Sequence, residues 1–354
     1  MSIKWSIQTA ARFGEFADAW DGLSRRCGHL PFLDSLFIQP LLGVFGKGDE
    51  QLALGYRDEE LVAAAILTRA GFGRWITFQP SQMPLGPLLI LPEMQLEKVS
   101  DSLLRALPGT NLALGLTQLD PLLTKRPAAT PNFASLDYIQ TAWVDIAGEF
   151  DGYWALRGKN LRQNMRKQRN KLAADGVEVV FDAMRSAESV EEAIRQYGVL
   201  ETSSWKSEEG TAVSLVNEQG RFYKAMLESF CRVGRGVIYR YRFGDHIVAM
   251  DLCIESGDLM VILKTSYDSS NKSLSPAFLM REEQFQQLFS EKKIRRVEFY
   301  GKLMEWHTRW TEQGRTLYHA NIYRHGLIPK LLALRSKLRK TESTEAKQLA
   351  PENT

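Results

Sequence analysis

Short apolar runs and helical periodicities alternate along the chain and predict a mixed α/β protein. In the first half, strands are expected at 5–9, 51–56, 61–69, 74–78, 111–116 and 138–146. Helices are expected at 13–26, 35–45 and 93–107. The segment 79–92 contains four prolines and predicts an irregular connection. We place a domain boundary after residue 146.

The second half repeats this order of elements. Strands are expected at 177–181, 237–243, 247–254, 259–267, 296–300 and 316–323. Helices are expected at 151–174, 188–202, 221–232 and from Ser275-Pro276 onward. The repeat lies in element order and not in sequence identity. It predicts domains at 1–146 and 147–326, a basic amphipathic helix at 327–340 and a disordered tail at 341–354.

Composition agrees with two globular domains. The 354 residues exceed one ordinary core, and 44% are hydrophobic. The net charge of +3 is too small to indicate nucleic-acid binding by itself. The cysteines have no metal or redox spacing and the histidines no ligand spacing, so we expect a reducing compartment and no metal. We also expect no permanently bound cofactor. No signal peptide or bilayer-length apolar run is apparent, so a cytoplasmic protein is expected.

The stretch from Leu259 to Met280 carries the first functional hypothesis. A buried strand leads through a polar loop to a helix that begins at Ser275-Pro276. Helix N-termini have unpaired N–H groups and a partial positive charge, which suit a phosphate or pyrophosphate. The alternative is an ordinary strand-to-helix connection. The expected anion-binding backbone groups are those of Ser273, Leu274, Ser275, Ala277 and Phe278.

Five motifs in order resemble the CelD/BcsL family, which is similar to the Fem-type peptidyltransferases. They are LRGKNLRQNMRKQRNKL, SSWKSEEGTA, HIVAMDL, SYDSSNKSLSPAFL and EFYGKLMEWHTRW, within residues 150–310. The resemblance implies an α+β (mixed α/β) fold of two tandem GNAT-like domains. Each would have a mostly antiparallel mixed sheet flanked by helices. The first domain would be degenerate, and the second would carry the active site in a cleft against the first.

The resemblance also implies a reaction. An acetyl or other acyl group would move from acyl-CoA to an amine or hydroxyl of a cell-envelope or exopolysaccharide precursor, by direct attack in a ternary complex. Two departures from the family pattern matter: Ala277 replaces a usual glycine, and Trp306-His307 replaces a Tyr-Lys pair. They keep open a non-catalytic accessory protein of polysaccharide biosynthesis. Aminoacyl transfer from charged tRNA is a further alternative.

Several side chains could supply the proton transfers. Asp251, Glu298 and His307 are candidate bases, with salt bridges or aromatic packing as the plainer interpretations. Tyr267 and Tyr300 are candidate acids for the leaving thiolate, with core packing as the alternative.

Acceptor contacts are expected from two regions. Trp205 and Lys206 lie in the loop that would cover the acceptor side. Arg162 and Arg166 belong to the basic helix, which would recruit a nucleotide-linked or lipid-linked sugar, hold tRNA, or simply be solvated. The helix at 327–340 would dock on the anionic inner face of a membrane or on a partner, or it would pack against the protein.

Overall fold

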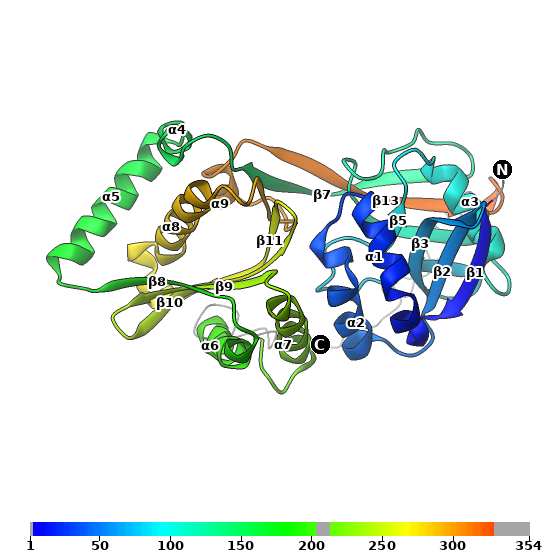
Figure 1. Ribbon diagram of the computed structural model, residues 1–354. Coiled ribbons are helices and arrows are strands. Elements are labelled where there is room, and N and C mark those ends of the chain that lie inside the picture. Colours follow the sequence, from blue (N-terminus) through cyan, green and yellow to red (C-terminus); the bar gives the residue numbers. More distant parts are fainter. Residues whose placement is uncertain (1–2, 203–212, 329–354) are drawn as a thin grey trace, which may run out of the picture.

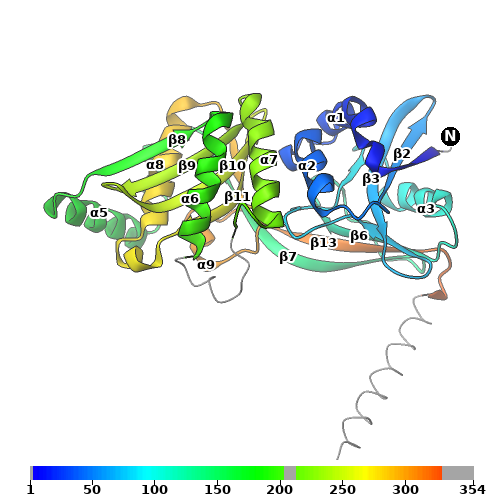
Figure 2. The same cartoon turned by 90° about the horizontal axis from the view of Figure 1, so that it is seen from below.

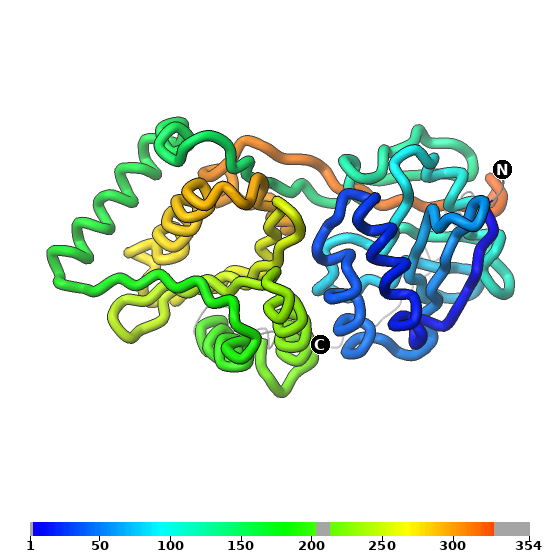
Figure 3. Tube along the Cα trace, in the orientation of Figure 1, coloured from blue at the N-terminus to red at the C-terminus, as the bar shows by residue number. Residues whose placement is uncertain are grey.

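The computed structural model describes residues 3–202 and 213–328 and places the two halves of the chain side by side (Figure 1). Strands β7 (Phe133–Asp145) and β13 (Gly314–Tyr323) run from one half into the other, as the view from below and the Cα trace also show (Figures 2 and 3). Trp205 and Lys206 lie outside the described residues. So do the tail expected at 341–354 and, from residue 329 onward, the helix expected at 327–340.

The first half forms the elements that its pattern predicts, with one addition. Its other strands are β1 (Lys4–Thr9), β2 (Gln51–Arg57), β3 (Glu60–Arg69), β4 (Arg74–Thr77), β5 (Leu88–Ile90) and β6 (Ala113–Leu119). Its α-helices are α1 (Ala17–Arg26), α2 (Ser35–Phe45) and α3 (Leu96–Ala106). The addition is β5, which pairs with β3 inside the segment expected to be irregular. A strand of three residues between prolines is too short to show the alternation of apolar and polar residues that predicts a strand.

The second half carries the remaining elements. Its strands are β8 (Val179–Met184), β9 (Gly236–Phe243), β10 (His246–Ser256), β11 (Leu259–Tyr267) and β12 (Arg296–Glu298). Its α-helices are α4 (Phe150–Ala155), α5 (Lys159–Ala174), α6 (Val190–Thr202), α7 (Glu218–Arg232), α8 (Pro276–Glu291) and α9 (Glu305–Thr308). Within the described ranges, no helix has the length and apolarity needed to cross a bilayer.

The single helix expected at 151–174 is in fact two helices, α4 and α5. Gly158 between them has an extended backbone, with ψ of 136°. Two hydrogen bonds to a residue far along the chain stabilise this interruption of the helix. The Tyr153 hydroxyl and the Arg157 guanidinium both donate to the carbonyl oxygen of Trp310, each at 2.7 Å. The chain therefore turns to meet Trp310 before the basic helix begins.

The described strands form one continuous sheet across both halves. The order is β1-β2-β3-β4-β6-β13-β7-β12-β11-β10-β9-β8, with β5 beside β3. Most neighbours are antiparallel, and the parallel pairs are β4–β6 and β11–β12. We expected the strand at 316–323 to belong to the second domain. Instead, β13 lies between β6 and β7, so it completes the sheet of the first half.

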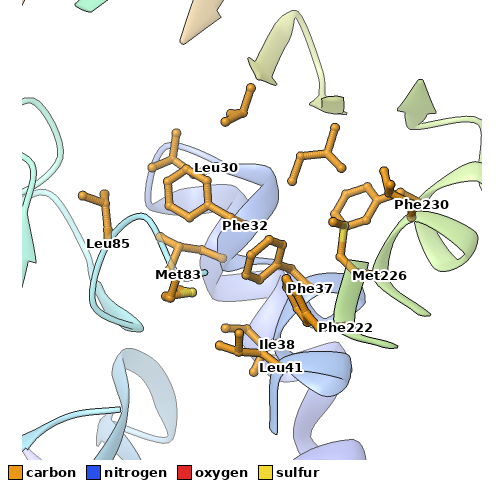
Figure 4. Close-up of a cluster of buried hydrophobic side chains, with 14 of the residues drawn as sticks. Leu30, Phe32, Phe37, Ile38, Leu41, Met83, Leu85, Phe222, Met226 and Phe230 are labelled. Atoms are coloured by element: carbon orange, nitrogen blue, oxygen red, sulfur yellow. The ribbon is translucent and has the colours of Figure 1, made fainter. Parts of the chain in front are cut away.

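Apolar side chains join the two halves beside the sheet. Phe37 of α2 packs edge-on against Phe222 of α7, with ring centroids 5.1 Å apart (Figure 4). Phe32 packs in the same manner against Tyr300, at 4.8 Å. This core covers the face of the second-half sheet that carries α6 and α7, whereas α5 and α8 cover the opposite face (Figures 1 and 2).

Candidate active site

The sheet opens where β11 and β12 separate. These parallel strands pair over three residues only, from Leu259 opposite Arg296 to Val261 opposite Glu298. There β12 ends, while β11 continues to Tyr267. The second half of β11 therefore has no partner strand on this side, and its edge borders an opening.

A β-bulge in β11 decides which side chains face α8. Leu252 of β10 is opposite Lys264 and Cys253 is opposite Ile262, so Leu263 is an extra residue. A bulge of this kind changes the face that the following side chains occupy. After the bulge, Thr265 reaches Arg281 of α8, while Lys264 lies over the Tyr197 ring of α6.

A pocket of about 340 Å³ occupies the opening on the α8 side. Its lining residues come from β11, from the start of α8 and from the chain around α9. They are Thr265, Tyr267, Lys272, Ser275, Pro276, Ala277, Phe278, Arg281, Trp306 and Trp310. The Trp310 side chain is held in place by two neighbouring rings. Its ring stacks on Phe278, with centroids 5.7 Å apart, and on Trp154, with centroids 6.0 Å apart. The pocket thus combines aromatic walls with two cationic side chains.

The expected backbone anion site is smaller than the sequence suggested. Ser275 adopts a left-handed conformation with φ of 53°, and its N–H donates to the carbonyl of Lys272. The N–H of Phe278 donates to Ser275, while Ser273 and Leu274 lie inside the short 3-10 turn over Ser269–Leu274. The N–H of Ala277 has no acceptor among the described residues. Ala277 therefore offers the clearest backbone donor at this helix start.

Asp251 lies behind the pocket and not in it. Its carboxylate is fully buried and forms an ion pair with Arg281 at 2.7 Å. The Thr265 hydroxyl donates to the same carboxylate at 2.6 Å. Burial raises the pKa of Asp251, and the Arg281 guanidinium opposes this rise. Asp251 can therefore act on a ligand only through Arg281 or Thr265.

His307 is also enclosed. Its Nδ1 accepts the backbone N–H of Met304 at 2.9 Å, and its ring stacks on Trp306 with centroids 3.5 Å apart. Burial, with the nearby Arg281 charge, lowers the pKa of His307 to about 4. The ring is therefore neutral at pH 7 with its proton on Nε2, and the Nδ1 lone pair is already used. This geometry argues against a role as general base.

Glu298 and Tyr300 lie on the opposite face of the sheet, in a second cavity of about 420 Å³ between the halves. We call it the junction cavity, and Gly28 and Leu30 of the first half also line it. Glu298 accepts from Arg315 at 3.0 Å, and burial raises the pKa of Glu298 to about 7.

A buried network occupies this junction cavity. The Tyr300 hydroxyl donates to Asp120 at 3.0 Å, and Asp120 forms an ion pair with Arg315 at 2.6 Å. Burial raises the pKa of Tyr300 well above its usual range. The sites of the two candidate carboxylates are distinct. Glu298 is opposite Val261, and because Leu263 is an extra residue, three ladder steps separate Val261 from Thr265. Glu298 is therefore about 10 Å along the strands from Thr265, at about 3.3 Å per residue.

Among the candidate acids, Tyr267 is the one that lines the pocket. Its hydroxyl has no hydrogen-bond partner among the described residues, so it is available to a ligand. Arg162 and Arg166 lie on the exposed face of α5, away from the pocket lining. Arg169 of the same helix instead binds Glu282 and Glu283 of α8, at 2.9 and 2.8 Å.

Residues 159–308 match a family model described as an acetyltransferase (GNAT) domain. This GNAT domain contains α5 to α9 and most of the pocket lining. No curated protein matches the chain.

Solved structures resemble the chain across both halves. FemX covers 87% of this chain and 96% of its own, with a TM-score of 0.56 at 7% identity. A conserved protein of unknown function from Bacteroides thetaiotaomicron covers 91% and 99%, with 0.54 at 11%. The C-terminal domain assigned to a lysylphosphatidylglycerol synthetase of Agrobacterium fabrum covers 84% and 91%, with 0.53 at 13%. Identities this low show the fold alone. The predicted mixed α/β fold of GNAT type, with its mostly antiparallel sheet, is confirmed.

Sequence reasoning missed Arg281, Thr265 and Arg315. A signal for the first existed, because a carboxylate inside the apolar strand around Asp251 requires a buried cation. The sequence does not say which of many arginines provides it. Thr265 depends on the bulge, and Arg315 depends on the return of β13 into the first-half sheet.

Proposed function

We propose that this chain transfers an acyl group from acyl-CoA to an amine or hydroxyl. One observation carries the proposal: an aromatic-walled pocket, with cationic side chains, fills the opening between β11 and β12 within the GNAT domain. In the proposal, the pocket holds the thioester end of the donor. The N–H of Ala277 and the ammonium group of Lys272 face its phosphates.

The reaction proceeds by direct attack. The acceptor nitrogen or oxygen forms a bond to the carbonyl carbon, the carbon–sulfur bond breaks, and the thiolate takes a proton from the Tyr267 hydroxyl. Glu298 is the candidate base, because its pKa of about 7 suits proton acceptance at neutral pH. This role requires the acceptor to extend from the junction cavity toward the pocket. The acceptor class, a cell-envelope or exopolysaccharide precursor, is carried over from the resemblance to CelD/BcsL proteins.

Thermal shifts with CoA, acetyl-CoA and longer acyl-CoAs test the donor. A ligand at one hundred times its dissociation constant adds about 2.7 kcal/mol of stability. Lys272→Met should reduce the shift. Lys292→Met is the matched control at the other end of α8, where the lysine pairs with Glu149, and it should leave the shift unchanged. Wild-type protein that shows no shift with any CoA species would contradict the proposal.

A second candidate is aminoacyl transfer from charged tRNA, and the surface of α5 favours it. Five cations of this helix are exposed, and its sequence contains no acidic residue. They are Lys159, Arg162, Arg166, Lys167 and Lys171. Tight tRNA binding that weakens steeply with salt and is lost in Arg162→Glu/Arg166→Glu would support this function. Weak binding that these changes do not alter would exclude it.

A further inference from the structure

Arg281 is a buried arginine that lines the proposed donor pocket. Its side chain is 2% exposed, and three elements hold it. Asp251 comes from β10, Thr265 from β11 and Gln284 from α8 itself. The aromatic rings of Phe285 and Phe299 flank the guanidinium, with centroids 6.0 and 5.7 Å from Cζ. Its position is therefore fixed before any ligand binds.

The hydrogen bonds of this guanidinium can be counted. Arginine has five N–H donors: two on each Nη and one on Nε. Nη1 donates to Gln284 Oε1 at 2.5 Å and lies 2.7 Å from Asp251 Oδ2 in an ion pair without hydrogen-bond geometry. Nη2 meets Asp251 Oδ1 at 3.2 Å and Thr265 Oγ1 at 3.1 Å. The Nε–H has no acceptor among the described residues. Nε is not among the fully buried side-chain atoms that lack a partner, so this N–H keeps some access to the pocket that Arg281 lines, and an acceptor from a ligand there can reach it.

We propose that Arg281 Nε–H binds the carbonyl oxygen of the transferred acyl group, and this inference rests on the proposed function. When the acceptor attacks, the carbonyl π electrons move to that oxygen, which becomes negative beside the guanidinium. The oxygen then re-forms the carbonyl as the carbon–sulfur bond breaks, and the sulfur receives a proton. A fixed donor in the wall of the pocket stabilises such an oxyanion without reorganising. Asp251, Thr265 and Gln284 are positioning residues, because they act through Arg281.

Binding of two CoA derivatives tests this assignment. Acetyl-CoA and S-ethyl-CoA differ mainly in the carbonyl oxygen, since the second is a thioether. We expect the wild-type protein to bind acetyl-CoA about tenfold more tightly by calorimetry, the effect of one hydrogen bond to a charged group. The variant Asp251→Leu/Arg281→Met replaces the whole ion pair with apolar side chains. Replacing both partners avoids leaving a lone buried charge and so favours folding.

The variant should bind free CoA and S-ethyl-CoA as the wild type does, lose the preference for acetyl-CoA, and show a fall in turnover. Arg232→Met, at the exposed end of α7, is the matched control and should keep the preference. Equal binding of the two derivatives by the wild type, or an unchanged preference in the variant, would overturn the assignment while leaving the proposed function intact. A parallel loss of free CoA binding would show a structural role only. If wild-type protein binds no CoA species, the proposed function fails and this inference fails with it.

Discussion

Replacing Glu298 by glutamine should stabilise the protein at pH 8 and change its stability little at pH 4.5. Burial raises the pKa of Glu298 from 4.5 to about 7. The folded protein therefore holds this proton more tightly than the unfolded chain does. As pH rises through this window, the unfolded state loses the proton first, and the free energy of unfolding falls. Above pH 7 the whole contribution is lost.

The size of the effect follows from the two pKa values. The difference between 4.5 and about 7 corresponds to about 3 kcal/mol, at about 1.4 kcal/mol per pKa unit. Glutamine keeps an oxygen that accepts from Arg315, and Arg315 keeps its ion pair with Asp120. The substitution therefore removes the buried negative charge without leaving Arg315 unpaired. A gain approaching this value is expected at pH 8.

The pH dependence of the wild-type free energy of unfolding would not by itself reveal the contribution of Glu298. The pKa of His307 is lowered to about 4, so His307 makes the folded state lose stability as pH falls below its ordinary value of 6.5. Between pH 4.5 and 6.5 the slopes of Glu298 and His307 have opposite signs and partly cancel. The difference between variant and wild type at each pH isolates Glu298, because His307 is present in both.

Urea unfolding followed by tryptophan fluorescence, at half-unit steps from pH 4.5 to 8, measures this difference. Glu305→Gln is the control, since Glu305 is 83% exposed on α9 and should give a difference near zero throughout. A stabilisation that is the same at every pH would refute the raised pKa. Destabilisation that grows toward pH 8 would show that Arg315 stabilises the carboxylate more than burial penalises it.

Three other predictions concern stability and reactivity. Lys292 ends α8 with φ of 54°, so Lys292→Gly should raise the free energy of unfolding by about 1 kcal/mol in urea melts; a lower midpoint would contradict this. His307→Phe should reduce the loss of stability between pH 6.5 and 4, and an unchanged acid profile would show that another group causes that loss. Burial raises the pKa of all three thiols, so a disulfide reagent at pH 8 should label them slowly in native protein and quickly in urea; rapid native labelling would contradict their burial. They are Cys27, Cys231 and Cys253.

The sequence pattern predicted the bounds of those helices and strands that begin and end at nearby turn residues. The helix at 35–45 and the strand at 259–267 have the expected bounds, because apolar period and turn residues fix them. The prediction of a single helix at 151–174 was wrong because of a contact with a distant part of the chain. Trp154, Leu161, Met165 and Leu172 keep one helical face across the break, but Arg157 bonds to a carbonyl more than 150 positions away. No periodicity in the sequence contains that contact.

The same limit applies to the candidate site. The stretch around Ser275-Pro276 does border a pocket, as the loop-to-helix pattern indicated. The pattern could not show that Asp251 and Glu298 lie on opposite faces of one sheet. Face assignment depends on strand register, and the bulge at Leu263 reverses the alternation within β11. A one-residue irregularity therefore decides that Thr265 and Tyr267 face α8.

The geometry of the opening suggests why the two halves are joined as they are. β12 ends after three residues, and the chain then passes through Tyr300, whose φ is 49°. On one side of the opening, α8 and Trp310 build the pocket. On the other, Phe32 of the first half packs against Tyr300 and leaves the junction cavity beside Glu298. Under the proposed function, donor and acceptor would approach one gap from opposite faces, and the first half would contribute to acceptor binding without touching the donor. Leu122 lines the same cavity and is 59% exposed, so Leu122→Trp can fill the cavity without straining the backbone. This change should raise KM for the acceptor and leave acyl-CoA binding unchanged, whereas equal losses for both substrates would show that the faces are not separate.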